Sequence, residues 1–241
     1  MTAVIGLAQL PTNTNQILKQ LTNTDRQQLL KHAELVELPF AELLCKPGDC
    51  YQYLYFPLTC LISLIAKLPG HPPLEMGLIG FEGLLGATLI LQQRQVPQEG
   101  IVQGAGIAWR IAVAPAELEI LRIKTLQLAM QRYLFQLIQQ QAQNAVCAHF
   151  HQVEARLARW LLMSDDRMQH QALYFTHQFL AQMLGVRRSS ITVAAGDLMV
   201  QGFIHYHRGH LKILNRQGLL QHSCRCYQPL ATATLQPDGR C

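Results

Sequence analysis

Two arginines followed by two serines are the side chains of this sequence best suited to a chemical task. Arg187, Arg188, Ser189 and Ser190 stand at the start of a segment with helical spacing. A guanidinium group can donate two hydrogen bonds to O6 and N7 of guanine, and short hydroxyls can contact phosphates or base edges. Because recognition helices present their N-terminal residues to the major groove, this order predicts contact with DNA.

The segment around these arginines has the spacing of a helix-turn-helix. Ala181 lies four residues before Gly185, and Gly185 lies six residues before Ile191. A small alanine lets two helices approach, a glycine permits the tight turn, and the isoleucine packs the second helix on the first. Thr176 is the expected N-cap of the first helix, and Gly202 the expected end of the second.

The residues directly after the second helix alternate between apolar and polar side chains. The stretch FIHYHRGHLKIL is divided by Arg208 and Gly209, so we expect a small β-hairpin, the wing of a winged helix, after a short strand near residues 173–175. An ordinary helical hairpin with exposed arginines is the simpler alternative. The residues expected to contact DNA are Thr176, His177, Gln178, Arg187, Arg188, Ser189, Ser190, Thr192, Val193, Arg208, His210 and Lys212.

The charge is unevenly distributed along the chain. Residues 1–146 contain ten Lys/Arg and ten Asp/Glu, whereas residues 147–241 contain ten and five and carry the whole net charge of +5. A neutral domain joined to a basic one indicates that only the second meets a polyanion, although a merely solvated basic face is the alternative. We therefore predict two domains, 1–146 for sensing and 147–241 for DNA binding.

The composition excludes disordered and membrane classes. With 49% hydrophobic and 15% charged residues, a chain of 241 residues can build one large or two ordinary cores. The longest apolar runs, such as Leu58 to Ala66, are too short to span a bilayer, and no signal peptide is evident. We expect a cytoplasmic protein without a membrane partner. Its seven cysteines contain no CxxC pair, which favours free thiols in a reducing compartment.

The N-terminal part predicts an α+β fold that begins with a roll. Residues 1–35 have helical spacing, and residues 36–113 show short apolar runs separated by Gly and Pro, typical of an antiparallel jelly-roll-like β-roll. One long helix is expected from Pro115 to about Cys147. A further amphipathic helix covers residues 148–163, and Asp165-Asp166 is expected to end it.

Apolar side chains recur every three or four residues along the long helix. Such a heptad seam usually pairs with a copy of itself, which predicts a homodimer. The alternative is that the helix lies on its own barrel, and the two can hold over different parts of the helix. The predicted seam residues are Ile123, Leu126, Met130, Tyr133, Leu137 and Asn144.

The order of roll, long helix and winged helix resembles the Crp/Fnr family of bacterial transcription regulators. The resemblance rests on EARLARWLL, FTHQFLAQMLGVRRSSIT, RGHLKIL and SCRCY within residues 150–227, and on the layout and the element IGFEG of residues 36–145. It implies a cyclic-nucleotide-binding-like roll, a coiled-coil homodimer and two DNA-reading winged helices, with RNA polymerase as a further partner. The family's leading base-reading arginine corresponds to Arg188. Ser189 and Val193 replace a glutamate and an arginine of the best-known members, so the operator is expected to differ.

The predicted sensor departs from members that bind cyclic nucleotides. Glu82 matches the glutamate that those members bring to the ribose, but VPQEG stands where their Arg-Ser or Arg-Thr pair meets the phosphate. Arg94 has no hydroxyl after it, and Glu99 would repel a phosphate. We expect no cyclic nucleotide. A small-molecule effector of unknown identity could use Glu82, Gly83 and Arg94.

Metal cofactors are not expected from the sequence. An iron–sulfur sensor needs four thiolate ligands. Three cysteines with four and nine residues between them are instead interpreted as buried, small apolar residues: Cys45, Cys50 and Cys60. Cys224 and Cys226 beside His222 could bind a metal but have no second pair. Haem is not indicated either, because ordinary structural roles are expected for His32, His71, His149 and His151.

Three classes of function compete for this chain. The leading hypothesis is a homodimeric DNA-binding transcription regulator on an inverted repeat, with half-sites about 34 Å apart. The second is a sensor or protein-interaction module whose winged helix does not bind DNA. We do not expect an enzyme, because the sequence contains no paired nucleophile and base, P-loop, GxGxxG after a strand, or HExxH.

Overall fold

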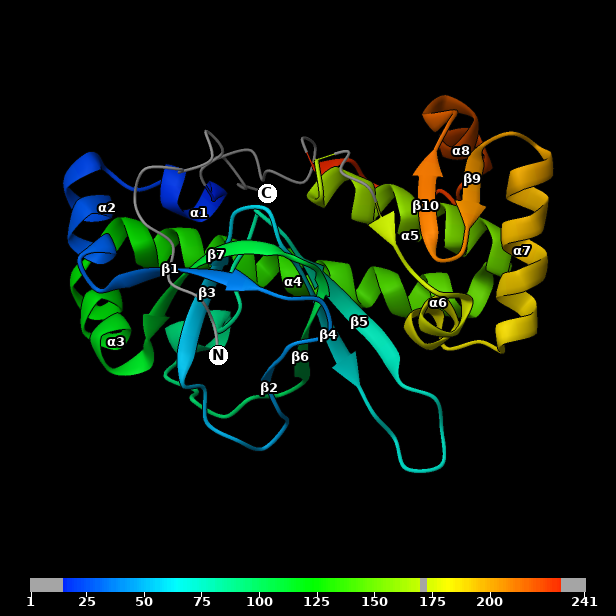
Figure 1. Ribbon diagram of the computed structural model, residues 1–241. Coiled ribbons are helices and arrows are strands. Elements are labelled where there is room, and N and C mark those ends of the chain that lie inside the picture. The colour runs from blue at the N-terminus through cyan, green and yellow to red at the C-terminus, as the bar shows by residue number, and fades with distance from the viewer. Residues whose placement is uncertain (1–14, 170–172, 231–241) are drawn as a thin grey trace, which may run out of the picture. The chain divides into compact units, whose positions relative to one another are not determined.

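The computed structural model describes residues 15–169 and 173–230 of the chain (Figure 1). These residues pack as two compact units. The first contains residues up to 64 together with 78–138, and the second contains 65–77 together with the residues from 139 onward. None of the helices in the described ranges is both long and apolar enough to cross a lipid bilayer.

An antiparallel β-roll built from two sheets makes up most of the first unit, and two of its strands share residues with the segment 65–77 of the second unit. One sheet has the strand order β1-β7-β3 and the other β2-β6-β4-β5. Val36 and Phe56 of the first sheet share one core with Ile62 and Val102 of the second, which explains why the sheets stay together. The predicted roll is thus confirmed. Its strands are β1 (Ala33–Leu38), β2 (Leu43–Cys45), β3 (Tyr53–Pro57), β4 (Leu61–Ala66), β5 (Leu74–Ile79), β6 (Glu99–Gly104) and β7 (Gly106–Ala112).

The N-terminal residues form less helix than the sequence predicts. The described chain begins with α1 (Gln16–Lys19) and α2 (Asn23–Leu30), capped by the side chains of Asn15 and Thr22. The chain then enters β1 at Ala33, where Leu35 pairs with Trp109 of β7. Pairing with β7 therefore overrides the helical spacing of residues 33–35. The predicted helix before residue 15 lies outside the described residues.

The predicted single long helix is two helices. A short 3₁₀ helix, η2 (Ala87–Leu91), precedes β6. After β7 the chain forms α3 (Val113–Arg122) and α4 (Lys124–Phe150). Ile123 separates α3 from α4 with an extended backbone, φ −94° and ψ 100°. The side chain of Gln127 donates to the carbonyls of Ile120 and Leu121, at 2.8 and 3.2 Å, and so satisfies acceptors that the break leaves without helical partners.

The predicted dimer seam belongs to the core of the protomer itself. Ile123, Leu126, Met130, Tyr133 and Leu137 are all at most 8% exposed and pack against the β-roll. The sixth seam residue, Asn144, donates its amide to the carbonyl oxygen of Met76 at 2.9 Å. These side chains make their contacts within one chain, as the alternative prediction of a helix that lies on its own barrel requires. The assignment of the five buried residues to a dimer seam is therefore corrected, whereas a place for Asn144 on such a seam stays a prediction.

The other face of α4 carries apolar residues that are not buried. Leu128, Phe135 and Ile138 are 42%, 49% and 57% exposed. Their spacings of seven and three residues place them on one side of the helix. We call this set the outer stripe.

The second unit is mainly helical and ends in a small sheet. Its elements are α5 (Val153–Arg167), β8 (Leu173–Tyr174), α6 (His177–Leu184), α7 (Arg188–Val200), β9 (Ile204–His207), β10 (His210–Ile213) and α8 (Arg216–His222), with the sheet order β8-β10-β9. Asp165 and Asp166 do not end α5, contrary to the prediction. Arg216 pairs with both carboxylates, at 2.8 Å from Asp165, and so offsets their charge near the helix C-terminus.

Candidate nucleic-acid interface

The turn between α6 and α7 is closed by backbone hydrogen bonds around one glycine. Gly185 has φ 62°, its N–H donates to the carbonyl of Gln182 at 3.2 Å, and the N–H of Val186 donates to the carbonyl of Ala181 at 2.9 Å. This pair of bonds is the Schellman motif, which requires a left-handed residue after the helix. The predicted roles of Ala181, Gly185 and the fully buried Ile191 in a helix-turn-helix are confirmed.

The far end of α7 is closed in the same way. Gly202 has φ 72°, its N–H reaches the carbonyl of Met199 at 2.9 Å, and the N–H of Phe203 reaches the carbonyl of Leu198 at 3.0 Å. At the start of α6, Thr176 is the N-cap and accepts a hydrogen bond from the N–H of Phe179 at 3.1 Å. Both predicted helix ends are therefore in place.

The first turn of α7 presents cations and hydroxyls to solvent. Arg187 occupies the N-cap position, Arg188 is the first helical residue, and both are exposed together with Ser189. The opposite face of α7 buries Ile191, Ala194, Ala195 and Leu198. Because the buried residues hold the helix, the exposed ones have no packing task, and the positive end of the helix dipole adds to the attraction for an anion.

Thr192 is exposed, but its hydroxyl is engaged within the domain. The hydroxyl donates to the carbonyl oxygen of Arg188 at 3.1 Å and lies 3.0 Å from Nδ1 of His177. The ring of His177 stacks on Tyr206, with centroids 4.5 Å apart and planes 19° apart. The group of Thr192 left to meet a ligand is therefore its methyl.

The predicted wing is present and is a two-residue hairpin. β9 and β10 pair antiparallel with His207 opposite His210, and Arg208 and Gly209 between them have φ 49° and 88°. Two consecutive positive φ values are the signature of a type I′ turn, whose twist matches the strands. Arg208, His210 and Lys212 are exposed along this hairpin. Predicted β8 is also confirmed and pairs with β10.

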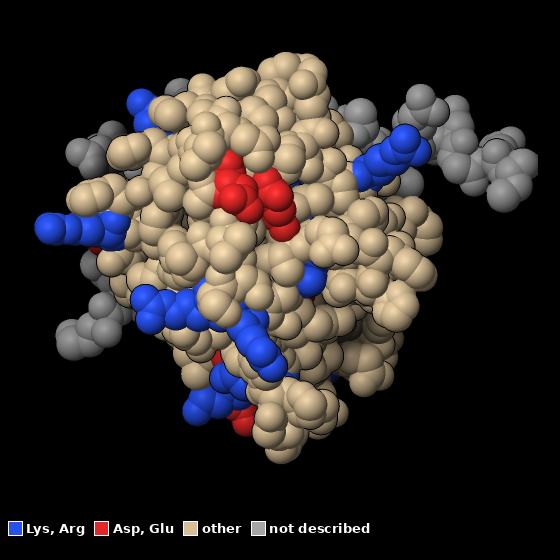
Figure 2. Space-filling view, turned by 90° about the vertical axis from the view of Figure 1, so that its right-hand side faces the viewer, with Lys and Arg blue, Asp and Glu red and all other residues tan. Residues whose placement is uncertain are grey.

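Cationic side chains gather on one part of the face that carries α7. Figure 2 looks at the side on which α7 lies in Figure 1, with Lys and Arg in blue. Several blue side chains lie together in the lower half, the level at which α7 begins, with a few acidic atoms beside them. Acidic atoms form a compact patch in the upper half, where further blue side chains project at the left and right edges. Uncharged residues cover most of the rest of this face.

The three residues proposed for an effector pocket have separate partners. Glu82 accepts a hydrogen bond from the N–H of Gly80 at 3.2 Å, and Arg94 forms an ion pair with Glu117, with Nε 2.6 Å from Oε1. The side chain of Tyr133 covers Gly83. These contacts do not join Glu82, Gly83 and Arg94 into one site.

The cysteines of the roll differ in their surroundings. Cys60 is fully buried, and burial raises the pKa of its thiol to about 12, in keeping with the predicted apolar role. Burial likewise raises the pKa of Cys45 to about 11. Cys50 is exposed, so the prediction that it is buried is wrong.

A second group of cysteines lies close together in the described part of the second unit. Cys147, His151, Cys224 and Cys226 are neighbours, although only Cys224 and Cys226 were paired by the sequence pattern. Hydrogen bonding with Cys224 lowers the pKa of the Cys147 thiol to about 7, with burial opposing and Arg159 assisting. His222, the expected companion of the cysteines, instead contacts Glu154 at 2.7 Å. The available signal was the four-residue spacing of Cys147 and His151, one helical turn.

Helices α5 to α8 and the hairpin thus form a winged helix-turn-helix, the class of domain that this geometry defines. Residues 155–222 match the family of the Crp-like helix-turn-helix domain. No curated protein matches the chain.

Several solved structures share the fold of most of the chain. A CRP-family regulator from Thermus thermophilus and FixK2 from Bradyrhizobium japonicum both give a TM-score of 0.67, at 14% and 12% identity, over 80% of this chain and 98% of theirs. The c-di-GMP-responsive regulator CLP of Xanthomonas campestris gives a TM-score of 0.61 at 17% identity, and the match covers 80% of this chain and 99% of that regulator. The chain therefore carries a Crp-like helix-turn-helix domain over residues 155–222 and shares the fold of these solved structures.

Proposed function

We propose that the chain is a sequence-specific DNA-binding transcription regulator that acts as a homodimer on an inverted repeat. The observation that carries the proposal is the exposed, basic first turn of α7, held by a buried face and two closed helix ends. A helix presented in this way can enter a major groove with its N-terminal residues first. The Crp-like domain match over residues 155–222 supports the same function.

The exposed residues divide into those that read bases and those that hold the backbone. We assign base reading to Arg188, with Ser189, Ser190 and the apolar Val193 beside it, since Val193 could meet a thymine methyl. Thr192 adds a methyl, and His177 acts by positioning Thr192 rather than by direct contact. Phosphate contacts that set the register are assigned to Thr176, Gln178, Arg187, Arg208, His210 and Lys212.

The outer stripe of α4 is the surface that we assign to the dimer. Leu128, Phe135 and Ile138 are apolar and exposed, and they repeat along a helix of 27 residues. A helix with such a stripe can pair with its own copy about a two-fold axis. Two copies of α7 related by that axis would read half-sites about 34 Å apart, one turn of DNA.

We also propose the division of labour along the chain. Residues 1–146 would serve as sensor and dimer platform and residues 147–241 as the DNA-binding part, in a cytoplasmic protein that acts with RNA polymerase. An effector of the roll would not be a cyclic nucleotide, because the ion pair with Glu117 already engages Arg94. Glu99 is buried where the phosphate-binding hydroxyl would be expected.

Footprinting tests the proposed function. Purified full-length protein would be incubated with a pool of genomic fragments, with and without a metabolite extract, beside Arg188→Ala. The expected result is a two-fold symmetric footprint that the variant loses. Absence of any footprint under both conditions would contradict the proposal and favour a module that acts through protein contacts. That alternative also predicts no steep salt dependence of DNA affinity.

A further inference from the structure

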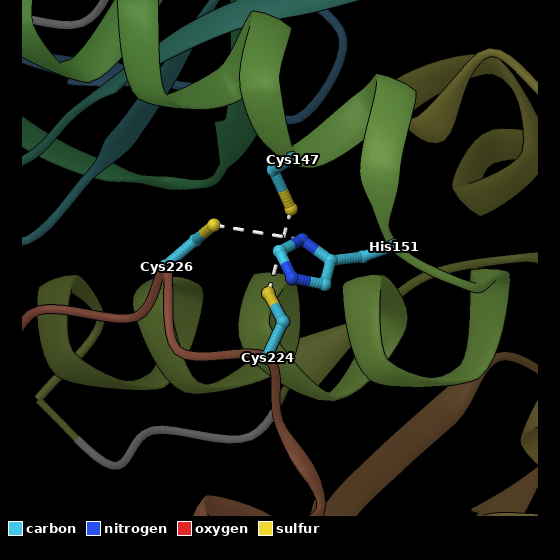
Figure 3. Close-up of side chains that lie close together, drawn as sticks. All are labelled: Cys147, His151, Cys224 and Cys226. Carbon is cyan, nitrogen blue, oxygen red and sulfur yellow. Dashed lines mark hydrogen bonds between the residues drawn. The ribbon is translucent and has the colours of Figure 1, made fainter.

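Four side chains with metal-binding atoms converge in the second unit (Figure 3). Cys147 lies in the last turn of α4 and His151 follows one turn later, where its N–H donates to the carbonyl of Cys147 at 3.2 Å. Cys224 and Cys226 come from the segment directly after α8. One ligand atom from each residue, a cysteine sulfur or a ring nitrogen of His151, lies within 4.8 Å of all the others, and the three cysteines are buried.

The separations suit a single tetrahedral ion. Sγ of Cys147 lies 3.4 Å from Sγ of Cys224, and Sγ of Cys226 lies 3.6 Å from Nδ1 of His151. In a tetrahedron with metal–sulfur bonds of about 2.3 Å, neighbouring ligand atoms are about 3.8 Å apart. An iron–sulfur cluster spreads its ligands over different iron atoms and therefore needs wider spacing.

The cysteine segment is held in place by groups that do not belong to the cluster. The N–H of Cys224 donates to the carbonyl of Ala155 at 3.4 Å, and the hydroxyl of Tyr227 donates to Asp166 at 2.7 Å. Nε of Arg159 donates to the carbonyl oxygen of Cys226 at 3.2 Å. Ligands whose backbone is already fixed lose little freedom when an ion binds, which favours binding.

The charge around the cluster also suits a metal with three thiolates. One divalent ion with three thiolates and a neutral imidazole carries a net charge of −1. Arg159 donates within the same segment, and Arg156 interacts electrostatically with Cys147 and Cys224. The two guanidinium groups would offset the residual negative charge without acting as ligands.

We propose that Cys147, His151, Cys224 and Cys226 bind one structural Zn²⁺ ion. Thiolate and imidazole are the ligands that zinc prefers in closed, four-coordinate structural sites. Binding replaces each thiol proton by a bond to the ion and releases that proton to solvent, with no change in oxidation state. The ion would fasten the segment after α8 to the residues where α4 gives way to α5.

The first test measures metal in the full-length protein. The chain would be loaded with Zn²⁺ under reducing conditions, dialysed, and analysed by mass spectrometry of the elements beside Cys224→Ser, His151→Ala and the control Cys50→Ser. Cys50 is exposed and lies outside the cluster. We expect about one ion per chain in the wild type and in the control, and at least a tenfold loss in both cluster variants.

The second test does not depend on whether those variants fold. Wild-type protein loaded with Co²⁺ should show the visible bands of a tetrahedral ion and the near-ultraviolet charge-transfer band of thiolate ligands. His151→Cys should keep the ion and strengthen the charge-transfer band, since a fourth thiolate replaces the imidazole.

Specific outcomes would overturn the zinc site. One is wild-type protein that keeps no ion after dialysis and gives no tetrahedral cobalt spectrum. Another is a Cys147–Cys224 disulfide in protein kept under reducing conditions, which would assign the cluster to redox chemistry instead. Equal metal loss in Cys50→Ser and Cys224→Ser would show that the ion sits elsewhere.

Discussion

Nδ1 of His177 lies 3.0 Å from the hydroxyl oxygen of Thr192, which links the first helix of the helix-turn-helix to the recognition helix. The hydroxyl gives its own hydrogen to the carbonyl of Arg188, so the imidazole must donate from Nδ1. Nε2 is buried without a hydrogen-bond partner, and a second proton there would be costly. Burial, followed by the charge of Arg188, lowers the pKa of His177. The ring is therefore neutral in the folded domain.

This linkage predicts a pH-dependent stability. Because the folded pKa is below the unfolded value of about 6.5, the unfolded chain takes up a proton first as the pH falls. Neutral His177 should therefore contribute its whole stabilisation at pH values above the unfolded pKa of about 6.5. Below that pH the contribution should decline, until the pH reaches the lower pKa of the folded state. Urea unfolding of wild type and His177→Phe at pH 7.5, 6.5 and 5.5 checks this. The difference between the two proteins should shrink toward acid pH, and a constant difference would contradict the linkage.

Arg188 and Lys212 should differ in what their removal does to DNA binding. We expect Arg188→Ala to cost about 1–3 kcal/mol and to relax the preference at one base pair. Lys212→Ala should weaken binding to all sequences alike and reduce the salt slope by about 1. Fluorescence anisotropy on single-base variants of the footprinted site, at several salt concentrations, separates these effects. A uniform loss in Arg188→Ala would instead make Arg188 a phosphate contact.

The helix-turn-helix could be predicted from the sequence because its determinants are local. Gly185, Gly202 and the pair Arg208-Gly209 each specify a left-handed backbone within a few residues of the helix or strand that they end. No distant contact is needed to infer these turns. The same reasoning placed the exposed arginines at the start of α7, since they stand directly after one such turn.

The role of α4 could not be predicted, because periodicity identifies an apolar face but not what covers it. Met130 and Phe135 both belong to regular apolar spacings, yet Met130 is buried in the roll and Phe135 is exposed. Only the roll, built from residues distant in sequence, decides between them. The cysteine cluster escaped prediction for a related reason, since Cys147 and Cys224 are 77 residues apart.

A charge on the outer stripe should separate the proposed dimer without unfolding the chain. Phe135→Lys places an ammonium group on an exposed position, so we expect a monomer with unchanged circular dichroism. Leu214→Lys, an exposed leucine outside α4, is the matched control and should remain dimeric. Sedimentation velocity measures both. A dimeric Phe135→Lys protein would move the interface away from this stripe.

The side chain of Tyr133 leaves no room for a Cβ atom at Gly83. A Cβ on Gly83 would lie 2.0 Å from Cζ of Tyr133, whose ring is buried. We expect Gly83→Ala to lower the free energy of unfolding by about 1–3 kcal/mol, as overpacked cores do. In a protein that already carries Tyr133→Leu, Gly83→Ala should lower the free energy of unfolding by less than it does in the wild type. A double-mutant cycle measured by urea unfolding compares the two values.

Gly196 provides the matched control for that extra methyl group. It lies within α7, and an added Cβ would meet no atom within 4 Å. Gly196→Ala should therefore raise the free energy of unfolding by up to about 1 kcal/mol, the gain in helix propensity. Equal destabilisation at Gly83 and Gly196 would argue against a clash with Tyr133.

The two glycine-closed ends of the helix-turn-helix bear on how such a domain changes over time. Its scaffold rests on backbone bonds and on the buried side of α7, whereas Arg188, Ser189 and Val193 are exposed. Substitutions at these three positions should leave thermal stability almost unaltered, since surface changes rarely exceed about 0.5 kcal/mol. The preferred operator sequence can therefore diverge between descendants of one ancestral domain while the fold persists. New target genes can be acquired through a series of variants that all remain folded.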